Sequence, residues 1–386
     1  MLLKLLFISK FLTDVAIKQQ KIKEIYMFKL FISIVVMTYS FINIAKADVS
    51  ISGFMQHIVG MGDEVDGGVT DKFTRVSFGA DTTADNGWTV GGSFAFSAQV
   101  VNSGASDAYL PTSNSMYVQT GMGTVTIGQT ADAATNLIPR VSAMVPGDGT
   151  DGYYFALFDS GTLATSDTGF AEVYYAQASS RINYALPVIN GFSVQVTYTP
   201  ALEFNSSTSN ARVQTTEASN HGEATHVAVS YEGEMDGISY VAGIASINGN
   251  AKSTAGATNN DLAVITGGVK ATMGNITVGA HAYDHGDSFG SVGQVNKASD
   301  AGYTLAMEYA MGNITVGVGY AHQEKVDGGA SSNVKEDTIT YFGVGYDIGG
   351  GVNTWVQLDN ISHSDGDHAT TETDPQLLMA GISLGF

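Results

Sequence analysis

The chain contains 386 residues, including 46 glycines, 6 prolines and no cysteine, and its formal net charge is -20. The lack of cysteine excludes a disulfide framework and a thiolate metal site. With 17 lysine and arginine residues against 37 acidic residues, the sequence also argues against a nucleic-acid partner, because phosphate binding requires clustered basic side chains.

The N-terminal region has the order of features that marks an export signal. A basic start at Met27 to Lys29 is followed by an apolar stretch and by the small-residue cleavage site Ala45-Lys46-Ala47. We therefore expect a signal peptide over residues 27–47 and a mature chain that begins at Asp48. Export does not require residues 1–26, so we interpret them as the result of a start codon assigned too early and not as structure.

From Asp48 onward, apolar residues alternate with small or polar residues, which is the period of a strand with two different faces. Between residues 192 and 199, for example, Phe192, Val194, Val196 and Tyr198 alternate with serine, glutamine and threonine. One face therefore suits hydrocarbon and the other tolerates water. Roughly sixteen such segments occur, and they begin near Asp48, Asp71, Gly87, Ser115, Thr124, Ser180, Gly191, Ala224, Gly237, Leu262, Asn275, Ala301, Asn313, Asp337, Val352 and Leu377.

The connections between these segments alternate between short and long. The short ones are rich in residues that accept a positive φ angle, such as Gly274-Asn275 and Gly312-Asn313, which lie in two copies of one short repeat. In an up-and-down barrel, the short turns lie on one rim and the long loops on the other. We therefore predict an all-β fold: a transmembrane antiparallel up-and-down β-barrel of about sixteen strands over residues 48–386. A β-sandwich is the alternative, but its turns have no reason to sort by length.

Several stretches carry a resemblance to a known family: Asp48 to Gly53, Thr74 to Gly79, Gly123 to Gln129, Arg181 to Tyr184, Gly191 to Ser193 and the closing Ile382 to Phe386. Over essentially all of residues 48–386, the chain resembles the trimeric general porins of Gram-negative bacteria, which have sixteen strands. The resemblance implies a homotrimer in the outer membrane, surrounded by outer-membrane lipid. It also implies that the outer-membrane assembly machinery recognises the terminal Phe386. The family often has arginine where Gln129 stands, which argues against an anion preference.

The longest connection, residues 131–179, is the candidate constriction. In the resembling family, the loop at this place folds into the barrel and narrows it, so the resemblance implies an inward-folded third extracellular loop. The candidate residues of the constriction are Asp148, Asp151, Asp159, Arg140 and Tyr153. The alternative is that the acids are solvated on an extracellular loop.

Three charged residues within strands are predicted to face the barrel interior. Arg75 alternates with Val76, Arg181 with Ile182, and Glu308 with Met307. A charge on the lipid side would cost about 2–4 kcal/mol near the midplane, so we expect all three in the pore wall, with the arginines pointing into water. Facing acidic and basic walls would set a transverse field across the narrowest point.

The sequence thus predicts a water-filled channel for passive diffusion of small hydrophilic solutes and ions, with a preference for cations because acids at the mouth concentrate counter-ions. Two alternatives stay open: a substrate-selective channel with an aromatic track, and a non-conducting surface barrel or adhesin. The eight histidines raise a lipid-acting enzyme as a third class, but we find no serine and histidine at a recognisable catalytic spacing and expect no enzyme.

No cofactor is expected. The acidic clusters at residues 63–66 and 364–367 offer hard oxygen ligands for weakly bound Ca²⁺. Neither cluster has the ligand spacing of a dedicated Ca²⁺ loop, which favours the interpretation of solvated acids.

Overall fold

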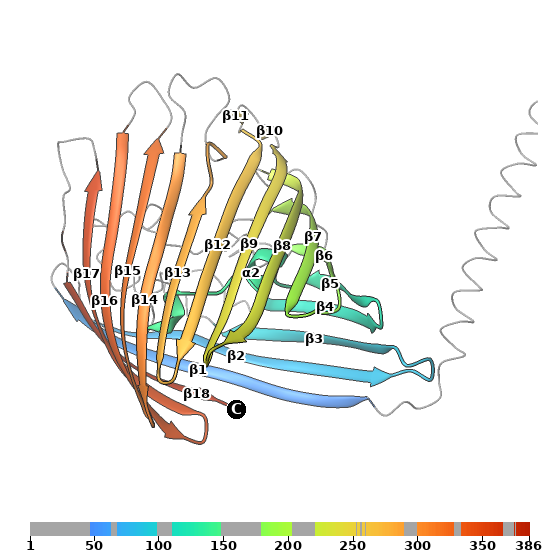
Figure 1. Cartoon of the computed structure of the whole chain (residues 1–386), viewed down its shortest axis with the longest axis horizontal. Helices are drawn as coiled ribbons and strands as arrows, with labels where there is room; N and C mark the ends of the chain where they lie inside the picture. Colours follow the sequence, from blue (N-terminus) through green and yellow to red (C-terminus); the bar gives the residue numbers. More distant parts are fainter. Residues whose placement is uncertain are drawn as a thin grey trace, which may run out of the picture.

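The computed structural model describes residues 47–62, 68–98, 110–147, 179–202, 221–251, 253–254, 257–258, 260–288, 299–327, 333–365, 374 and 376–386. In this part of the chain, sixteen antiparallel strands close into one barrel (Figure 1). The expected signal peptide and residues 1–26 lie outside the described residues, so those interpretations stay predictions. The barrel strands are β1 (Asp48–Gly62), β2 (Gly68–Thr83), β3 (Thr89–Ala98), β4 (Leu110–Thr120), β5 (Gly123–Gln129), β6 (Ser180–Ala185), β7 (Phe192–Leu202), β8 (His221–Met235), β9 (Ile238–Ala251), β12 (Leu262–Met273), β13 (Ile276–Asp284), β14 (Ser299–Met311), β15 (Ile314–Asp327), β16 (Asn333–Gly349), β17 (Val352–Asp365) and β18 (Gln376–Gly385).

Each barrel strand pairs with the next one along the chain, which confirms the up-and-down topology that the sequence predicts. The ring closes where β1 pairs with β18, from Phe54 opposite Gly385 to Gly62 opposite Leu377. Two further hydrogen bonds join Gly53 to the terminal Phe386, at 2.7 and 3.0 Å. Closure leaves no sheet edge in the hydrocarbon, where an unpaired backbone group would cost several kcal/mol. A separate two-stranded sheet, β10 (Ser253–Thr254) and β11 (Ala257–Thr258), lies between β9 and β12 along the chain.

The short connections all lie at one rim, because consecutive strands run antiparallel. Both copies of the predicted turn repeat have glycine in the left-handed region, with φ of 60° at Gly274 and 59° at Gly312. Only glycine adopts this conformation without strain, so these turns are fixed by local chemistry. The strand ends from which the long connections depart therefore lie at the opposite rim.

The two faces of the strands separate as the alternation predicts. In β7, Phe192 and Tyr198 are exposed on the outer surface, whereas Gln195 and Thr197 are buried on the inward side. The outer surface thus presents large apolar residues from nearly every strand, which is a surface suited to lipid. Among the described residues, no helix has the length and the hydropathy that a transmembrane helix requires.

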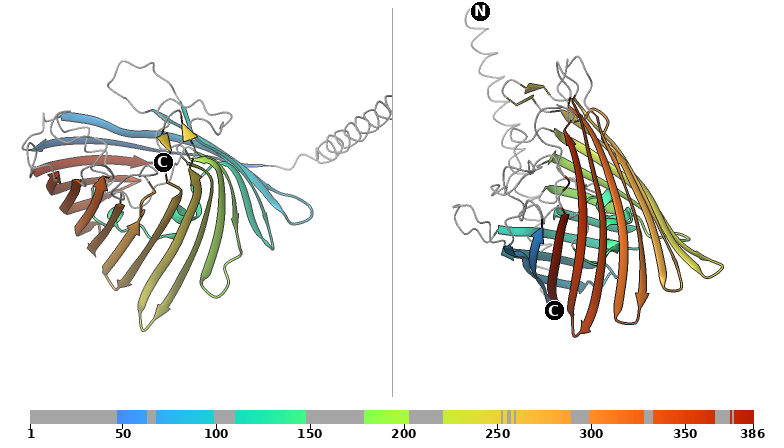
Figure 2. Two further views of the ribbon diagram at one scale, coloured as in Figure 1. Left: turned by 90° about the horizontal axis from the view of Figure 1, so that it is seen from above. Right: turned by 90° about the vertical axis from the view of Figure 1, so that its left-hand side faces the viewer.

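Part of the chain lies inside the barrel and packs against the inward faces of the strands. After β5, the chain forms the short helix α2 (Ala133–Leu137) and the 3₁₀ turn η1 (Ser142–Met144). α2 packs on the inward side of β7, β8 and β9, and η1 packs on β14. Figure 2 shows α2 inside the ring of strands when the barrel is viewed from above. The described start of the long connection therefore lies within the barrel.

Candidate functional site

The long connection is fixed to the barrel wall at its first residues. Asp132 is the N-cap of α2, and its Oδ1 accepts a hydrogen bond from the backbone nitrogen of Thr135 at 2.8 Å. Aspartate is a favoured N-cap because its carboxylate satisfies a backbone donor that the helix leaves unpaired. The side chain of Asp132 is also almost completely buried, at 1% exposure. A buried carboxylate requires charged or hydrogen-bonding partners, and the barrel wall supplies them.

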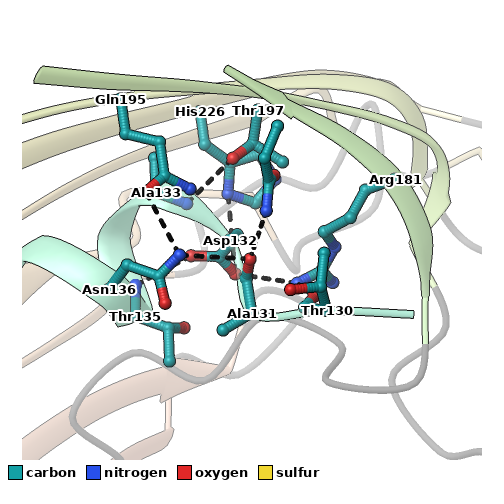
Figure 3. A network of polar contacts seen from close by, with 11 residues as sticks. Thr130, Ala131, Asp132, Ala133, Thr135, Asn136, Arg181, Gln195, Thr197 and His226 are labelled. Carbon is teal, nitrogen blue, oxygen red and sulfur yellow. Dashed lines mark hydrogen bonds and ion pairs between the residues drawn. The ribbon is translucent and has the colours of Figure 1, made fainter. Parts of the chain in front are cut away.

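Arg181 on β6 and His226 on β8 are the wall partners of Asp132 (Figure 3). Nη1 of Arg181 lies 3.5 Å from Oδ2 of Asp132, and it donates a shorter hydrogen bond of 2.8 Å to the backbone oxygen of Thr130. Nδ1 of His226 lies 3.8 Å from the same carboxylate oxygen. Arg181 and His226 are 2% and 0% exposed. The three side chains form a buried polar cluster that joins the start of the connection to two strands.

Neutral hydrogen bonds complete this attachment (Figure 3). The backbone nitrogen of Ala133 donates to Oγ1 of Thr197 at 2.9 Å. Asn136 donates to Oε1 of Gln195 at 3.2 Å. On β6, Asn183 donates to the backbone oxygen of Ala131 at 2.7 Å. The inward faces of β6, β7 and β8 thus hold α2 in one position.

Beyond α2, the chain continues along the inner wall directly on the strand backbones. We call residues 131–147 the inner segment. It lies on inward-facing glycines: a Cβ added to Gly243 would be 2.7 Å from the backbone oxygen of Leu137, and one added to Gly279 would be 2.6 Å from Sδ of Met144. Gly268, Gly317 and Gly343 are covered in the same way by Pro139, Val145 and Pro146. At these five positions the wall has no side chain, so the inner segment lies directly against the strand backbone.

The inner segment ends beside β17, where Gly147 contacts Gln357. Apolar residues surround this end of the segment: Val141, Met144 and Val145 belong to one buried cluster with inward-facing residues of β1 and β14 to β18. Ile339, Ile361 and Leu377 in this cluster are completely buried although they face the barrel interior. Toward the rim of long loops, this side of the wall is therefore a packed core.

The inward face of β2 to β5 is different, because it is polar and partly exposed. Ser93 is exposed, while Arg75, Ser77, Ser115 and Tyr117 are half-exposed. Arg75 donates a hydrogen bond from Nη2 to Oγ of Ser113 on β4 at 2.9 Å. Water inside the barrel therefore reaches the wall on β2 to β5.

Acidic side chains gather on inward positions toward the rim of short turns. Glu308 on β14 is half-exposed, and Glu232 and Glu234 on β8 are exposed. Glu308 is the direct cross-strand partner of Thr277 on β13, which is in turn the partner of Thr272 on β12, so all three side chains share the inward face. Asp81 on β2 and Asp347 on β16 also occupy inward, exposed positions, and Lys270 on β12 is a half-exposed cation on the inward face.

The structure places the predicted wall residues as follows. Arg75, Arg181 and Glu308 all lie on inward faces, but Arg181 does not point into water as expected, because the inner segment covers it. Arg140 is half-buried within the inner segment. Asp148, Asp151, Asp159 and Tyr153 lie outside the described residues, so the constriction over residues 131–179 stays a prediction beyond residue 147.

Sequence reasoning missed Asp132, His226 and the inward glycines. Asp132 precedes Ala-Ala-Thr-Asn-Leu, and an aspartate before such a run is an N-cap signal. Sequence reasoning also missed a hydrolase pattern: residues 286–290 read G-x-S-x-G. In the structure, Ser288 is completely buried, its Oγ bonds to the backbone oxygen of His285, and no helix follows β13 in the described residues. The imidazole of His285 bonds instead to Asp300, at 2.9 Å.

The described residues hold no group of three or more histidine or acidic side chains arranged to bind a metal ion. Most residues of the two acidic clusters named as candidate Ca²⁺ ligands lie outside the described part of the chain. Weak Ca²⁺ binding there stays a prediction.

Comparison with known proteins agrees with this architecture. A sequence profile described as Gram-negative porin matches residues 33–366. No curated protein sequence matches the chain. Among solved structures, an anion-selective porin from Comamonas acidovorans has a TM-score of 0.61 at 14% identity, with 88% of this chain and 100% of that chain covered. The trimer form of OmpT, an outer membrane protein of Vibrio cholerae, has a TM-score of 0.59 at 15% identity, with 88% and 99% covered.

Proposed function

The chain belongs to the Gram-negative porin family and is a channel of the outer membrane, and we propose that it forms a water-filled pore through which small hydrophilic solutes and ions diffuse passively. The observation that carries the proposal is the closed barrel with an apolar outer surface and a polar, partly exposed inner wall on β2 to β5. Such a wall lets hydrated solutes pass without removal of their water. Passive diffusion requires no catalytic step.

We propose a preference for cations. Inward positions near the rim of short turns include the exposed or half-exposed carboxylates of Asp81, Glu232, Glu234, Glu308 and Asp347. Arg75 on β2 and Lys270 on β12 are half-exposed cations at inward positions. Excess negative charge along a channel concentrates cations and excludes anions. The similar fold of an anion-selective porin does not oppose this, because selectivity follows the wall charges and not the fold.

Recording from a planar bilayer tests the pore itself. Refolded protein of residues 48–386 should insert with discrete, reproducible conductance steps in 1 M KCl. A barrel whose interior is filled, which is the adhesin alternative, would insert without any steps. Circular dichroism and heat-modifiable mobility of the same sample establish that the barrel has folded, so an absence of steps contradicts the proposal.

We further propose that the channel is a homotrimer. The trimer form of the Vibrio cholerae protein supports this, together with the outward apolar residues of the barrel, which can contact either lipid or a second copy. Closed cyclic symmetry is the usual assembly of identical subunits. Light scattering of the protein in detergent, corrected for bound detergent, should give three times the mass of one chain.

Phe386 is proposed to be the residue that the outer-membrane assembly machinery recognises. It also has a structural role, because its backbone joins Gly53 and its ring covers that glycine. These two roles can be separated, since assembly in cells depends on both and refolding of pure protein depends only on the structural one.

A further inference from the structure

The barrel interior has two chemically different walls. On β14 to β18, most inward side chains toward the rim of long loops are buried, and the apolar ones form one cluster with residues of the inner segment. On β2 to β5, the inward positions that water reaches carry mainly hydroxyl groups, including Ser77, Ser93, Ser115 and Thr126. Solutes inside the barrel therefore meet hydroxyl groups on the wall that the inner segment leaves uncovered.

One aromatic ring lies along this hydroxyl-rich wall. Tyr117 on β4 is paired with Gly91 on β3. A Cβ added to Gly91 would be 2.6 Å from both Cζ and Oη of Tyr117, so the ring extends across the glycine and lies along the wall. Tyr117 is half-exposed, which leaves part of the ring open to the interior.

Other inward aromatic residues use the same arrangement but are covered. Tyr341 lies over Gly319, and Trp355 lies over Gly381. Their exposures are 0% and 6%. An inward aromatic ring over a cross-strand glycine is therefore a repeated feature of this barrel, and Tyr117 is the member of the set on the wall that water reaches.

Phe54 supplies a second aromatic surface on the open side. It lies on the same face of β1 as the inward residues Gln56 and Ile58, and it is 37% exposed. Phe54 is the direct cross-strand partner of Arg75. Along the wall, from the rim of long loops toward the rim of short turns, Phe54 and Arg75 come first. The serines follow, and Tyr117 lies last, beside Asp81.

We propose that this wall, from Phe54 to Tyr117, is a binding track for uncharged ring-shaped sugars. A pyranose has an apolar C–H face, which packs on an aromatic ring, and a rim of hydroxyl groups, which exchange hydrogen bonds with serine hydroxyls, an arginine and a carboxylate. The proposal rests on the pore proposed above and names the solute class that the pore favours. An open-chain polyol offers the same hydroxyl groups without the flat C–H face, so the track favours the ring.

Uptake into proteoliposomes tests the track with two probes, D-glucose and D-sorbitol, which have six carbons each and similar size. At equal low concentrations, the wild-type protein should admit labelled glucose faster than labelled sorbitol. Tyr117→Leu replaces the ring by a smaller aliphatic side chain, so the ratio of the two rates should fall by roughly two- to tenfold, which is the effect of one aromatic contact. Tyr117→Phe keeps the ring and should keep the ratio.

Tyr309→Leu is the matched control, because Tyr309 is an exposed tyrosine on the outer surface of β14. It should leave the ratio unchanged. Equal rates for both probes in the wild type, or a Tyr117→Leu ratio equal to that of the wild type, would overturn the sugar track while the pore itself stands. Failure of the pore is recognised separately, since neither probe would then enter and no conductance steps would be seen.

Discussion

Gly243 on β9 and Gly268 on β12 are direct cross-strand partners, and the inner segment lies on both of them. Gly317 and Gly343 form a second such pair further round the barrel. Pairs of glycines weaken a sheet, because they contribute no side-chain packing. In this barrel they allow a chain segment to lie against the wall, so the local loss is offset by the packing of residues 131–147.

Gly243→Ala should displace the inner segment. The added Cβ would lie 2.7 Å from the backbone oxygen of Leu137, which cannot rotate away. Forcing an extra group into a packed site costs about 1–3 kcal/mol. Urea unfolding in lipid vesicles, followed by the fluorescence of Trp88 and Trp355, should show this loss. Gly121→Ala is the control, because its Cβ would meet nothing within 4 Å, and a loss of equal size there would contradict the close contact.

Asp132→Asn should isolate the contribution of the buried ion pair. Asparagine caps a helix as well as aspartate does, so the bond to Thr135 is retained while the charge opposite Arg181 is lost. Breaking a buried pair costs about 3–5 kcal/mol, because one charge stays buried without its partner. The same unfolding measurement should detect it, together with increased open-channel current noise.

The double variant Asp132→Asn with Arg181→Met gives the critical comparison. Replacing both charges should recover much of the loss, because no unpaired charge remains. Asp236→Asn, in the exposed turn between β8 and β9, controls for the loss of one acid. If the double variant is less stable than Asp132→Asn alone, Arg181 is held by its bond to Thr130 and the ion pair contributes little.

Phe386→Ala should separate structure from recognition. The backbone bonds to Gly53 do not require the ring, so the purified variant should refold in detergent with a loss of only about 1–3 kcal/mol for the missing side chain. Assembly into the outer membrane of cells should fall much further, as measured by the folded fraction in membrane extracts. Equal losses in both assays would assign Phe386 a structural role alone.

The barrel could be predicted because its determinants are local. Alternation along each strand and glycine in turns such as Gly312-Asn313 need no information from distant residues, and the predicted strand starts differ from the observed ones by a few residues. The inward faces followed from the same alternation, which is why Arg75 and Glu308 were placed on the interior side.

Residues whose role depends on the inner segment could not be placed in this way. Alternation assigns Arg181 and Ile339 to the inward face but cannot tell that another part of the chain covers them. The inward glycines carry no signal of their own, because glycine in a strand has several causes. Tyr117 was missed for the same reason, since the glycine beneath its ring is on a different strand.

Neutralising Asp148, Asp151 and Asp159 together to asparagine tests the constriction that the sequence predicts beyond the inner segment. If these acids line the narrowest part of the channel, the ratio of cation to anion permeability should fall, because each unit charge acts over a short distance there. Reversal potentials in a KCl gradient measure this ratio. An unchanged ratio would place the three acids away from the ion path.

Glu232, Glu234 and Glu308 test whether acids of the described wall contribute to cation preference. A unit charge acting across about 10 Å of water changes the energy of a passing ion by about 0.4 kcal/mol, which is about a factor of two in its local concentration. Each replacement by glutamine should lower the local cation concentration about twofold and raise that of anions about twofold, so the permeability ratio should fall by roughly fourfold for each. The effect should be smaller at 1 M salt because of screening. Lys270→Gln should act in the opposite direction, since it removes positive charge from the same wall.

Glu336→Gln is the control, because this acid lies at an exposed outward position of β16. A ratio that responds to Glu336 as strongly as to Glu308 would mean that the net charge of the protein, and not the charge along the wall, sets the selectivity.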